Sequence, residues 1–169
     1  MKTNHEAPAL KVVLQQTTNN TTAWMGHGLT DEDIVAGQTF TCPYEGELGG
    51  IEIFSSLVIK PGHAEMTVHP FDPSSKKWGD ALLSTSVKID KTDNEKWILF
   101  PQHGLKLQKG LTYGFRIKSE DMYIGIGEAA GSHAQPPFTG GQEWISPSDN
   151  HPGKYFNYLS LAFKVEMRA

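Results

Sequence analysis

The sequence predicts an all-β fold, a two-sheet antiparallel β-sandwich of the jelly-roll type. Short runs rich in Val, Ile, Phe, Thr and Tyr recur along the chain, and Gly, Pro, Asp and Asn separate them at intervals of roughly 8–12 residues. No run shows the apolar spacing of an amphipathic helix. At 169 residues, the chain is long enough to bury one core, so residues 1–169 are expected to form a single domain.

Each expected strand follows from alternation between turn signals. Residues 1–35 are expected to hold a first strand at 9–17 and a long polar connection. Gly49 and Gly50 indicate a kink or bulge in the strand that contains them. Residues 131–156, which hold four prolines and four glycines, are interpreted as an ordered loop. The other strands are expected at 36–42, 47–59, 64–71, 81–89, 96–101, 110–119, 122–128 and 154–167.

Alternate residues of these strands are expected to point into one core between the two sheets. The expected core residues are Phe40, Ile51, Ile53, Met66, Val68, Leu83, Val87, Ile98, Phe100, Tyr113, Phe115, Ile117, Leu161, Phe163 and Val165.

Composition excludes several classes of protein. The formal net charge is −4, which argues against a nucleic-acid partner, because such proteins carry a basic surface. No apolar stretch reaches about 18 residues, so no membrane insertion is expected. Cys42 is the only cysteine, which rules out an internal disulfide and is interpreted as a buried thiol. The N-terminal segment shows no signal-peptide core; an intracellular protein and one whose signal was removed both stay open, so the localisation is unknown.

Motifs for catalysis are missing, so no enzyme is expected. G-x-S-x-G and H-E-x-x-H do not occur. The stretch "GIGEAAG" has the spacing of a dinucleotide fingerprint, but no helix is expected after it, and its glycines are assigned to the end of a strand. Glu143 and Asp149 are a candidate glycosidase pair, which would need a common cleft with the two carboxyls about 5–9.5 Å apart.

No cofactor and no metal site is predicted. His63, Glu65 and His69 share one strand face, but the two histidines would lie roughly 20 Å apart, and a solvated polar face is the preferred interpretation. Asp31, Glu32 and Asp33 lack the spacing of a dedicated calcium loop, so a solvated turn is the preferred interpretation. A structural calcium ion bound by their oxygens is the alternative.

The tryptophans define the candidate binding site. Trp97 lies in an apolar strand and is assigned to the core, whereas Trp24, Trp78 and Trp144 lie in loop-like segments. An indole in a polar loop either packs back onto the core or presents a flat face on which the C–H face of a sugar ring can stack. For Trp144 both alternatives stay open. The candidate ligand-binding residues are Trp144, Gln142, Asp149, Asn150, Tyr155 and Trp78.

Residues 36–168 resemble bacterial jelly-roll domains similar to carbohydrate-binding modules. The resemblance rests on "GQTFTCPYEGELGGIEIF", "WGDALLSTSVKI", "KWILF" with "LKLQKGLTYGFRI", and the closing "YFNYLSLAFKVEM". It implies a jelly roll, a setting in secreted or surface-anchored proteins, and sugar binding as the commonest function of such domains. Fold alone does not establish function.

The residues and the resemblance together predict a non-catalytic binding module whose ligand is a carbohydrate. The alternative is a structural or adhesion module that contacts another protein or self-associates through an exposed sheet face or strand edge.

Overall fold

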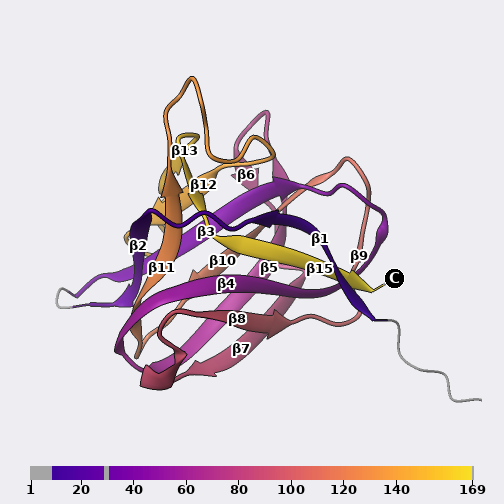
Figure 1. Cartoon of the computed structure of the whole chain (residues 1–169). Helices are drawn as coiled ribbons and strands as arrows, with labels where there is room; N and C mark the ends of the chain where they lie inside the picture. Colours follow the sequence, from indigo (N-terminus) through magenta and orange to yellow (C-terminus); the bar gives the residue numbers. More distant parts are fainter. Residues whose placement is uncertain (1–8, 29–30, 169) are drawn as a thin grey trace, which may run out of the picture.

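The computed structural model describes residues 9–28 and 31–168, and their regular secondary structure is antiparallel strand apart from one short 3₁₀ turn (Figure 1). Among them, no helix has the length and apolar character needed to cross a membrane. The elements are β1 (Leu10–Gln16), β2 (Thr21–His27), β3 (Asp33–Thr41), β4 (Gly46–Lys60), β5 (Gly62–Asp72), β6 (Lys77–Trp78), β7 (Leu83–Ile89), the 3₁₀ turn η1 (Lys91–Asp93), β8 (Lys96–Pro101), β9 (Lys106–Leu107), β10 (Thr112–Lys118), β11 (Tyr123–Ala130), β12 (Glu143–Ser146), β13 (Lys154–Phe156), β14 (Leu159–Leu161) and β15 (Phe163–Arg168).

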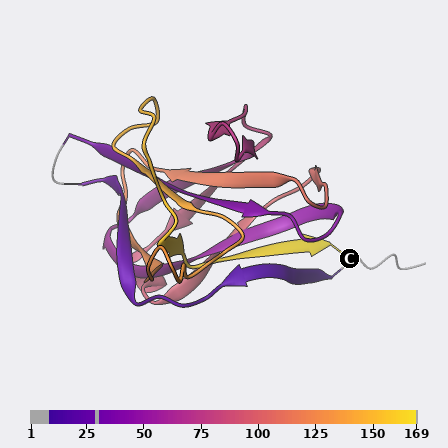
Figure 2. The ribbon, with the colours of Figure 1, turned by 90° about the horizontal axis from the view of Figure 1, so that it is seen from above.

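The strands form two facing layers, which confirms the predicted β-sandwich (Figure 2). In sheet A, β4 pairs with β8 and β9 on one side and with β15 and β11 on the other; β1 extends β15, while β2 and β14 extend β11. Sheet B has the order β7-β5-β10-β3-β12-β13, and β6 pairs with the end of β5. A short β2–β3 pairing joins the two layers at one corner.

The core lies between the sheets, as the alternation predicts. Opposed pairs such as Ile53 with Phe163 in sheet A and Phe115 with Val68 in sheet B point inward and are fully buried. All the expected core residues are buried except Leu83 and Val87, which are half-buried. Those two lie on β7, which pairs only with β5, so an edge strand leaves one flank of each side chain uncovered.

The bulge predicted in the long strand is present. The register of β4 with β15 shifts between Gly50 and Leu48, which face Glu166 and Met167. The residue left over is Gly49, and the side chain of Leu10 packs directly against its α-carbon. A β-carbon there would collide with Leu10, so glycine is required by this close approach.

The prediction of a polar connection before residue 36 was wrong. Residues 21–27 form β2, which pairs with β11 along its length. Its inward residues are Ala23 and Met25, both buried, whereas the intervening positions face out. Residues 131–156 likewise contain β12 and β13 in addition to the connection that rises above the sandwich in Figure 1.

Cys42 is a buried thiol, as predicted. It is 1% exposed, and its Sγ donates a hydrogen bond to the carbonyl of Tyr44 (2.9 Å). Burial disfavours the thiolate and raises the pKa of Cys42, although the Tyr44 contact opposes this shift. The side chain therefore stays a neutral packing group, which argues against a nucleophilic role.

Candidate functional site

Trp144 lies on the outer side of sheet B but is completely buried. β12 places it opposite Gly37 of β3, and its exposed fraction is 0%. Its Nε1 donates a hydrogen bond to the carbonyl of Pro152 (3.0 Å), and Gly153 packs against the indole with a positive φ of 68°. The residues after β12 therefore fold over the ring. Of the two alternatives for Trp144, the structure has the indole packed back onto the fold beneath its own loop.

A guanidinium lies over two indoles that pack against each other beside this loop, with the ring centroids of Trp78 and Trp144 5.5 Å apart. The Cζ of Arg116 lies 4.4 Å from the ring centroid of Trp78 and 4.3 Å from that of Trp144. Two glycines give the indoles room: a β-carbon on Gly114 would lie 2.5 Å from Trp78, and one on Gly37 would lie 3.2 Å from Trp144. Stacking of a cation on both ring faces stabilises this cluster, which forms a partial third layer outside sheet B.

The remaining aromatic residues of this region also serve packing. Trp78 is half-buried and packs edge-on against Phe71 at 5.2 Å, and Tyr155 packs against Phe71 at 5.8 Å. The hydroxyl of Tyr155 donates a hydrogen bond to the carbonyl of Lys76 (3.1 Å). Desolvation raises the pKa of Tyr155. A shallow cleft of ≈ 570 Å³ runs past Phe71, Trp78 and Tyr113, but Phe71 and Tyr113 show less than a tenth of their surface.

Asp149 and Asn150 are exposed on the loop that covers Trp144. The Asp149 carboxylate accepts a hydrogen bond from Lys118 Nζ (2.9 Å) and lies 3.8 Å from Arg116. The Asp149 contact raises the pKa of Lys118, whereas burial lowers that of Arg116. Asp149 borders a groove of ≈ 580 Å³ that also contains Asp33, Glu65, Glu120 and Asp121. The groove is rich in carboxylates, and none of its described lining residues is a Phe, Tyr or Trp.

Gln142 lies apart from that groove. It borders a smaller hollow of ≈ 360 Å³ with Phe138 and Asn157, and its backbone N–H donates to Thr39 Oγ1 (2.8 Å). Three of the six predicted residues line hollows: Asp149 lines the groove, Gln142 the smaller hollow and Trp78 the cleft. The smaller hollow and the cleft adjoin, because both are lined by Phe71, Pro73 and Thr112. The six residues do not form a single ligand-binding surface.

The predicted solvated face of β5 is only partly solvated. His63 is exposed beside Asp121. His69, by contrast, is 8% exposed, with Nε2 2.7 Å from Thr67 Oγ1 and Nδ1 2.9 Å from the carbonyl of Gly79. Desolvation lowers its pKa, so His69 is a neutral packing residue under Trp78.

No metal centre of three or more His, Cys, Asp or Glu side chains is found in residues 9–28 and 31–168. Of the three carboxylates considered for calcium, Asp33 is engaged with His27, whose Nδ1 lies 2.6 Å away. Asp31 and Glu32 are exposed. Residues 29 and 30, which precede them, lie outside the described part of the chain.

The two carboxylates considered as a glycosidase pair do not face one cleft. Glu143 pairs with Gln38 on the inward side of sheet B and is 0% exposed, whereas Asp149 lies on the outer side. In the stretch "GIGEAAG", residues 125–130 lie in β11 and Gly131 directly follows it, which confirms the interpretation that its glycines belong to the end of a strand.

The outer face of sheet A carries the accessible aromatic surface. Trp24 is 38% exposed and is the most exposed of the four tryptophans. Its indole lies over Gly125 of β11, where a β-carbon would be 3.1 Å from the ring, and it stacks on Tyr123 with centroids 5.5 Å apart and planes inclined by 17°. Leu57 flanks Gly125 on its other side and is 41% exposed. We call Trp24, Tyr123 and Leu57, with Gly125 beneath, the Trp24 platform.

The same face continues across β4 and β8. Phe54 packs over Gly127, its ring meets that of Trp97 edge-on at 5.4 Å, and Lys164 Nζ lies 4.2 Å above the Trp97 ring. Trp97 is half-buried on this outer surface, so its assignment to the core was wrong. Ile98 and Phe100, on the same strand, point inward. The strand "KWILF" therefore has one face in the core, and large side chains cover its other face.

Two carboxylates lie side by side beyond Lys164. Glu52 pairs with Lys164 on β15, and Glu166 follows two residues later on the same face. A hydrogen bond with Glu52, together with burial, raises the pKa of Glu166 to about 7. The pair therefore shares a proton near neutral pH, and it lies next to an aromatic surface with a lysine at its edge.

From the sequence, Trp24 was assigned to a loop, whereas it lies in β2. Two signals mark its true place: Ala23 and Met25 alternate around it as inward residues, and Gly125 and Gly127 alternate along β11. Glycines at every second position of a strand leave one face without side chains, and large neighbours can lie flat on it.

No protein-family model matches this chain, and no curated protein matches it in sequence.

Proposed function

We propose that the protein is a non-catalytic carbohydrate-binding module and that its ligand stacks on the Trp24 platform. The observation that carries the proposal is the exposed indole of Trp24, whose ring edge lies against Gly125 and which stacks on Tyr123. A fixed aromatic plane open to solvent suits the C–H face of a sugar ring, and it loses little side-chain entropy on binding.

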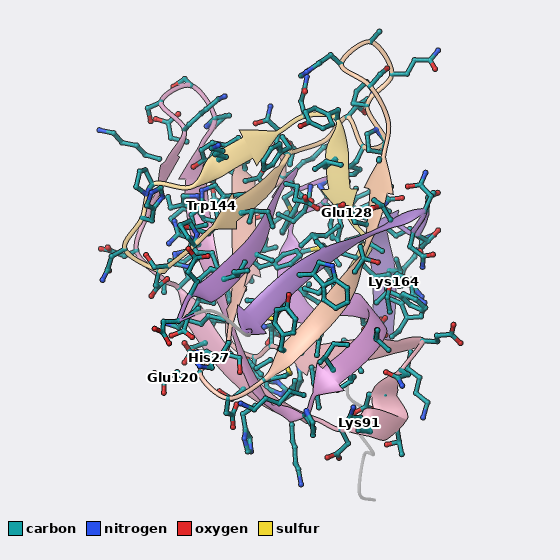
Figure 3. The ribbon with its side chains drawn as sticks, turned by 90° about the vertical axis from the view of Figure 1, so that its left-hand side faces the viewer. His27, Lys91, Glu120, Glu128, Trp144 and Lys164 are labelled. Atoms are coloured by element: carbon teal, nitrogen blue, oxygen red, sulfur yellow. The ribbon has the colours of Figure 1, made fainter. Side chains whose placement is uncertain are left out.

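Polar side chains for the sugar hydroxyls are available on the same face of sheet A. Lys164, Glu52 and Glu166 lie on adjacent strands beyond Phe54 and Trp97 (Figure 3 labels Lys164). A few directed hydrogen-bonding groups beside an apolar surface are typical of sites for small polar ligands. This combination is absent from the groove beside Asp149, whose described lining has no aromatic residue.

The absence of catalysis is part of the proposal. Glu52 and Glu166 are in hydrogen-bonding contact, whereas a glycosidase needs its two carboxyls about 5–9.5 Å apart to leave room for the scissile bond. The pair therefore suits the binding of hydroxyls better than acid–base hydrolysis.

The experiment compares Trp24→Ala with Tyr44→Ala in a binding screen of soluble glycans and insoluble polysaccharides. Tyr44 is a matched control, because it is 59% exposed but lies in the turn between β3 and β4. We expect quenching of tryptophan fluorescence by the ligand, at least about tenfold weaker binding by Trp24→Ala (about 1.4 kcal/mol), and no change in Tyr44→Ala. The proposal fails if no glycan binds the wild-type protein or if Trp24→Ala binds as tightly as wild type.

A second candidate function is supported by two aliphatic residues that are exposed near the end of β4. Leu57 and Ile59 are each more than 40% exposed, and neighbouring exposed apolar groups mark contacts between proteins. In this case the sheet face would bind a protein or a second copy of the chain. Light scattering after size exclusion discriminates: a dimer that Leu57→Glu converts to monomer, together with no response to glycans, would favour this function.

A further inference from the structure

β7 lies along the lower edge of the sandwich in Figure 1, and one of its two sides has no partner strand among residues 9–28 and 31–168. On its other side it pairs with β5 over all seven residues, from Leu83 opposite Val68 to Ile89 opposite Gly62, without a shift of register. Alternate residues of an edge strand direct their N–H and C=O groups away from the neighbouring strand. β7 therefore presents a row of backbone donors and acceptors with which another strand can pair.

The other edge strands of the described sheets are shorter, interrupted or already joined to a second strand. The register of β1 shifts between Val12 and Leu14, and Lys11 lies opposite the inward residue Met167. A bulge and an inward charge both protect an edge against pairing with another chain. β8 ends at Pro101, β2 also pairs with β3, and β6, β9, β13 and β14 contain two or three residues each. β7, by contrast, is seven residues long and contains no proline, glycine or bulge.

The side chains of β7 also leave surface that a further strand would cover. Leu83 and Val87 point toward the core, with Thr85 between them, but all three are only half-buried. On the outer side of the sheet, Ser84 and Ser86 are small and exposed. A strand added at this edge would cover the open flanks of the apolar side chains, and the small hydroxyl groups would let it approach closely.

We propose that β7 pairs with β7 of a second copy of the chain, antiparallel and about a twofold axis at Ser86. This register pairs all seven residues of the strand, because Leu83 of one copy lies opposite Ile89 of the other. It also keeps the inward side chains on the inward face. A surface that binds its own copy closes as a dimer. The interface joins the two B sheets into one continuous sheet.

The charges on the outer side of sheet B favour a second copy of β7 over an unrelated strand. In this register Lys88 of one copy lies opposite Ser84 of the other, so the two lysines stay apart. Ser84 Oγ donates a hydrogen bond to the carboxylate of Glu65 (3.1 Å), which lies on the neighbouring strand β5. Each Lys88 therefore approaches a carboxylate of the opposite copy, and the twofold axis repeats this attraction.

The dimer would present both Trp24 platforms on one side. A twofold axis perpendicular to the joined B sheets places the two A sheets on the same side of them, so their outer faces point the same way. A polymeric ligand can then bind both platforms at once, which raises the apparent affinity without a new contact. This consequence rests on the proposed function, whereas the dimer itself does not.

The test measures the mass of the full chain by sedimentation velocity at concentrations between roughly 1 µM and 1 mM. We expect a reversible dimer that becomes the main species toward the upper end of this range. No glycan enters the measurement, so its result is independent of the proposed function. A wild-type protein that stays monomeric throughout the range overturns the proposal.

Substitutions on two edge strands locate the interface. Ser86→Lys places two ammonium groups opposite each other at the axis, so it should weaken dimerisation at least about tenfold. Ser86 is exposed, so this variant should fold, which circular dichroism checks. Gln15→Lys adds the same charge at an exposed position of β1 and is the matched control, which should dimerise like wild type. The proposal is overturned if Ser86→Lys dimerises as tightly as wild type. It is also overturned if Gln15→Lys or Leu57→Glu dissociates the dimer, because the interface then lies on sheet A.

Cysteine substitutions test the register. Ser86→Cys places two thiols opposite each other at the axis, with their α-carbons about 4.5–5.5 Å apart, which is within the span of a disulfide. In Ser84→Cys the two thiols lie roughly 13 Å apart along the paired strands. Diamide should therefore cross-link Ser86→Cys on a non-reducing gel. It should leave Ser84→Cys and the wild type, whose Cys42 is buried, as single chains. A missing cross-link in Ser86→Cys, or equal cross-linking of Ser84→Cys, overturns this register and with it the proposal.

Discussion

The two outer faces of this sandwich use tryptophan in opposite ways. On sheet B, Trp78 and Trp144 pack against each other, the guanidinium of Arg116 lies over both rings, and the chain after β12 covers Trp144. On sheet A, Trp24 lies over a glycine in a similar manner, but more than a third of its surface stays exposed. Glycines in the underlying strand make room for an indole on both faces. An indole that a chain segment covers, such as Trp144, only stabilises the fold, whereas an indole left exposed, such as Trp24, is also accessible to a ligand.

The largest expected loss of stability follows from a substitution on the outer face of sheet B. Trp144→Ala empties a fully buried indole site and removes the hydrogen bond to Pro152, so we expect a loss of about 3–5 kcal/mol in the free energy of unfolding. Urea denaturation followed by circular dichroism measures it. Trp144→Phe should lose less. A loss below about 1 kcal/mol for Trp144→Ala would mean that the loop covers sheet B without depending on the ring.

The next effect concerns the cation over the indoles. Arg116→Met keeps the length of the side chain but removes the charge that stacks on Trp78 and Trp144, so a loss of about 2 kcal/mol is expected. Lys118→Met is the matched control, because Lys118 also pairs with Asp149 but is 41% exposed; its loss should stay below about 1 kcal/mol. Equal losses in the two variants would show that the Asp149 ion pair matters and the stacking does not.

A smaller effect on stability is expected on the sheet A side. Trp24→Ala removes an indole that is partly wet, so the free energy of unfolding should fall by about 1 kcal/mol, well below the loss for Trp144→Ala. The same denaturation experiment measures it. If Trp24→Ala destabilises the protein as much as Trp144→Ala does, the two faces are alike and Trp24 is a structural residue.

The smallest expected effect on stability concerns Glu166, on the polar part of the outer face of sheet A. In the folded state the pKa of Glu166 is about 7, above its ordinary value of 4.5. Between these values the native state binds more protons than the unfolded state, so this residue lowers stability as pH rises from about 4.5 to 7, and its contribution is constant above that range. The free energy of unfolding of Glu166→Gln, compared with that of wild type, should therefore rise as pH increases from about 4.5 to 7, by less than about 1 kcal/mol. Unfolding in urea from pH 5 to pH 8 tests the sign, and a constant difference would contradict it.

Hydrophobic alternation was sufficient to predict the two layers and their core. Residues such as Phe40, Ile51 and Phe163 are inward-facing in the sequence pattern and buried in the structure, because a strand has only two faces and one of them must leave water. The strand β2 was missed because the same alternation is weak there. Its two inward residues, Ala23 and Met25, are too few to stand out among threonines and glycines.

The candidate site could not be predicted in the same way. The place of Trp24 depends on the pairing of β2 with β11, which sets it beside Gly125, a residue far away in the sequence. Trp144 is covered by the nearby residue Pro152, but no residue pattern states that this loop folds back onto the ring. Glu143 was considered as a catalytic group, and its interior position follows only from the register of β12 with β3. A one-residue shift of that register would exchange Glu143 and Trp144 between the two sides of the sheet.

The antiparallel pairing of β1 with β15 has a practical consequence. Leu10 lies opposite Arg168, so the described chain starts and finishes at one corner of the sandwich, and Figure 1 shows β2 at the opposite end. A protein coupled to a bead or a sensor chip through either end would therefore point Trp24 away from the support. In such an assay, the orientation of the immobilised protein would leave Trp24 accessible, so it would not explain a failure to bind a ligand.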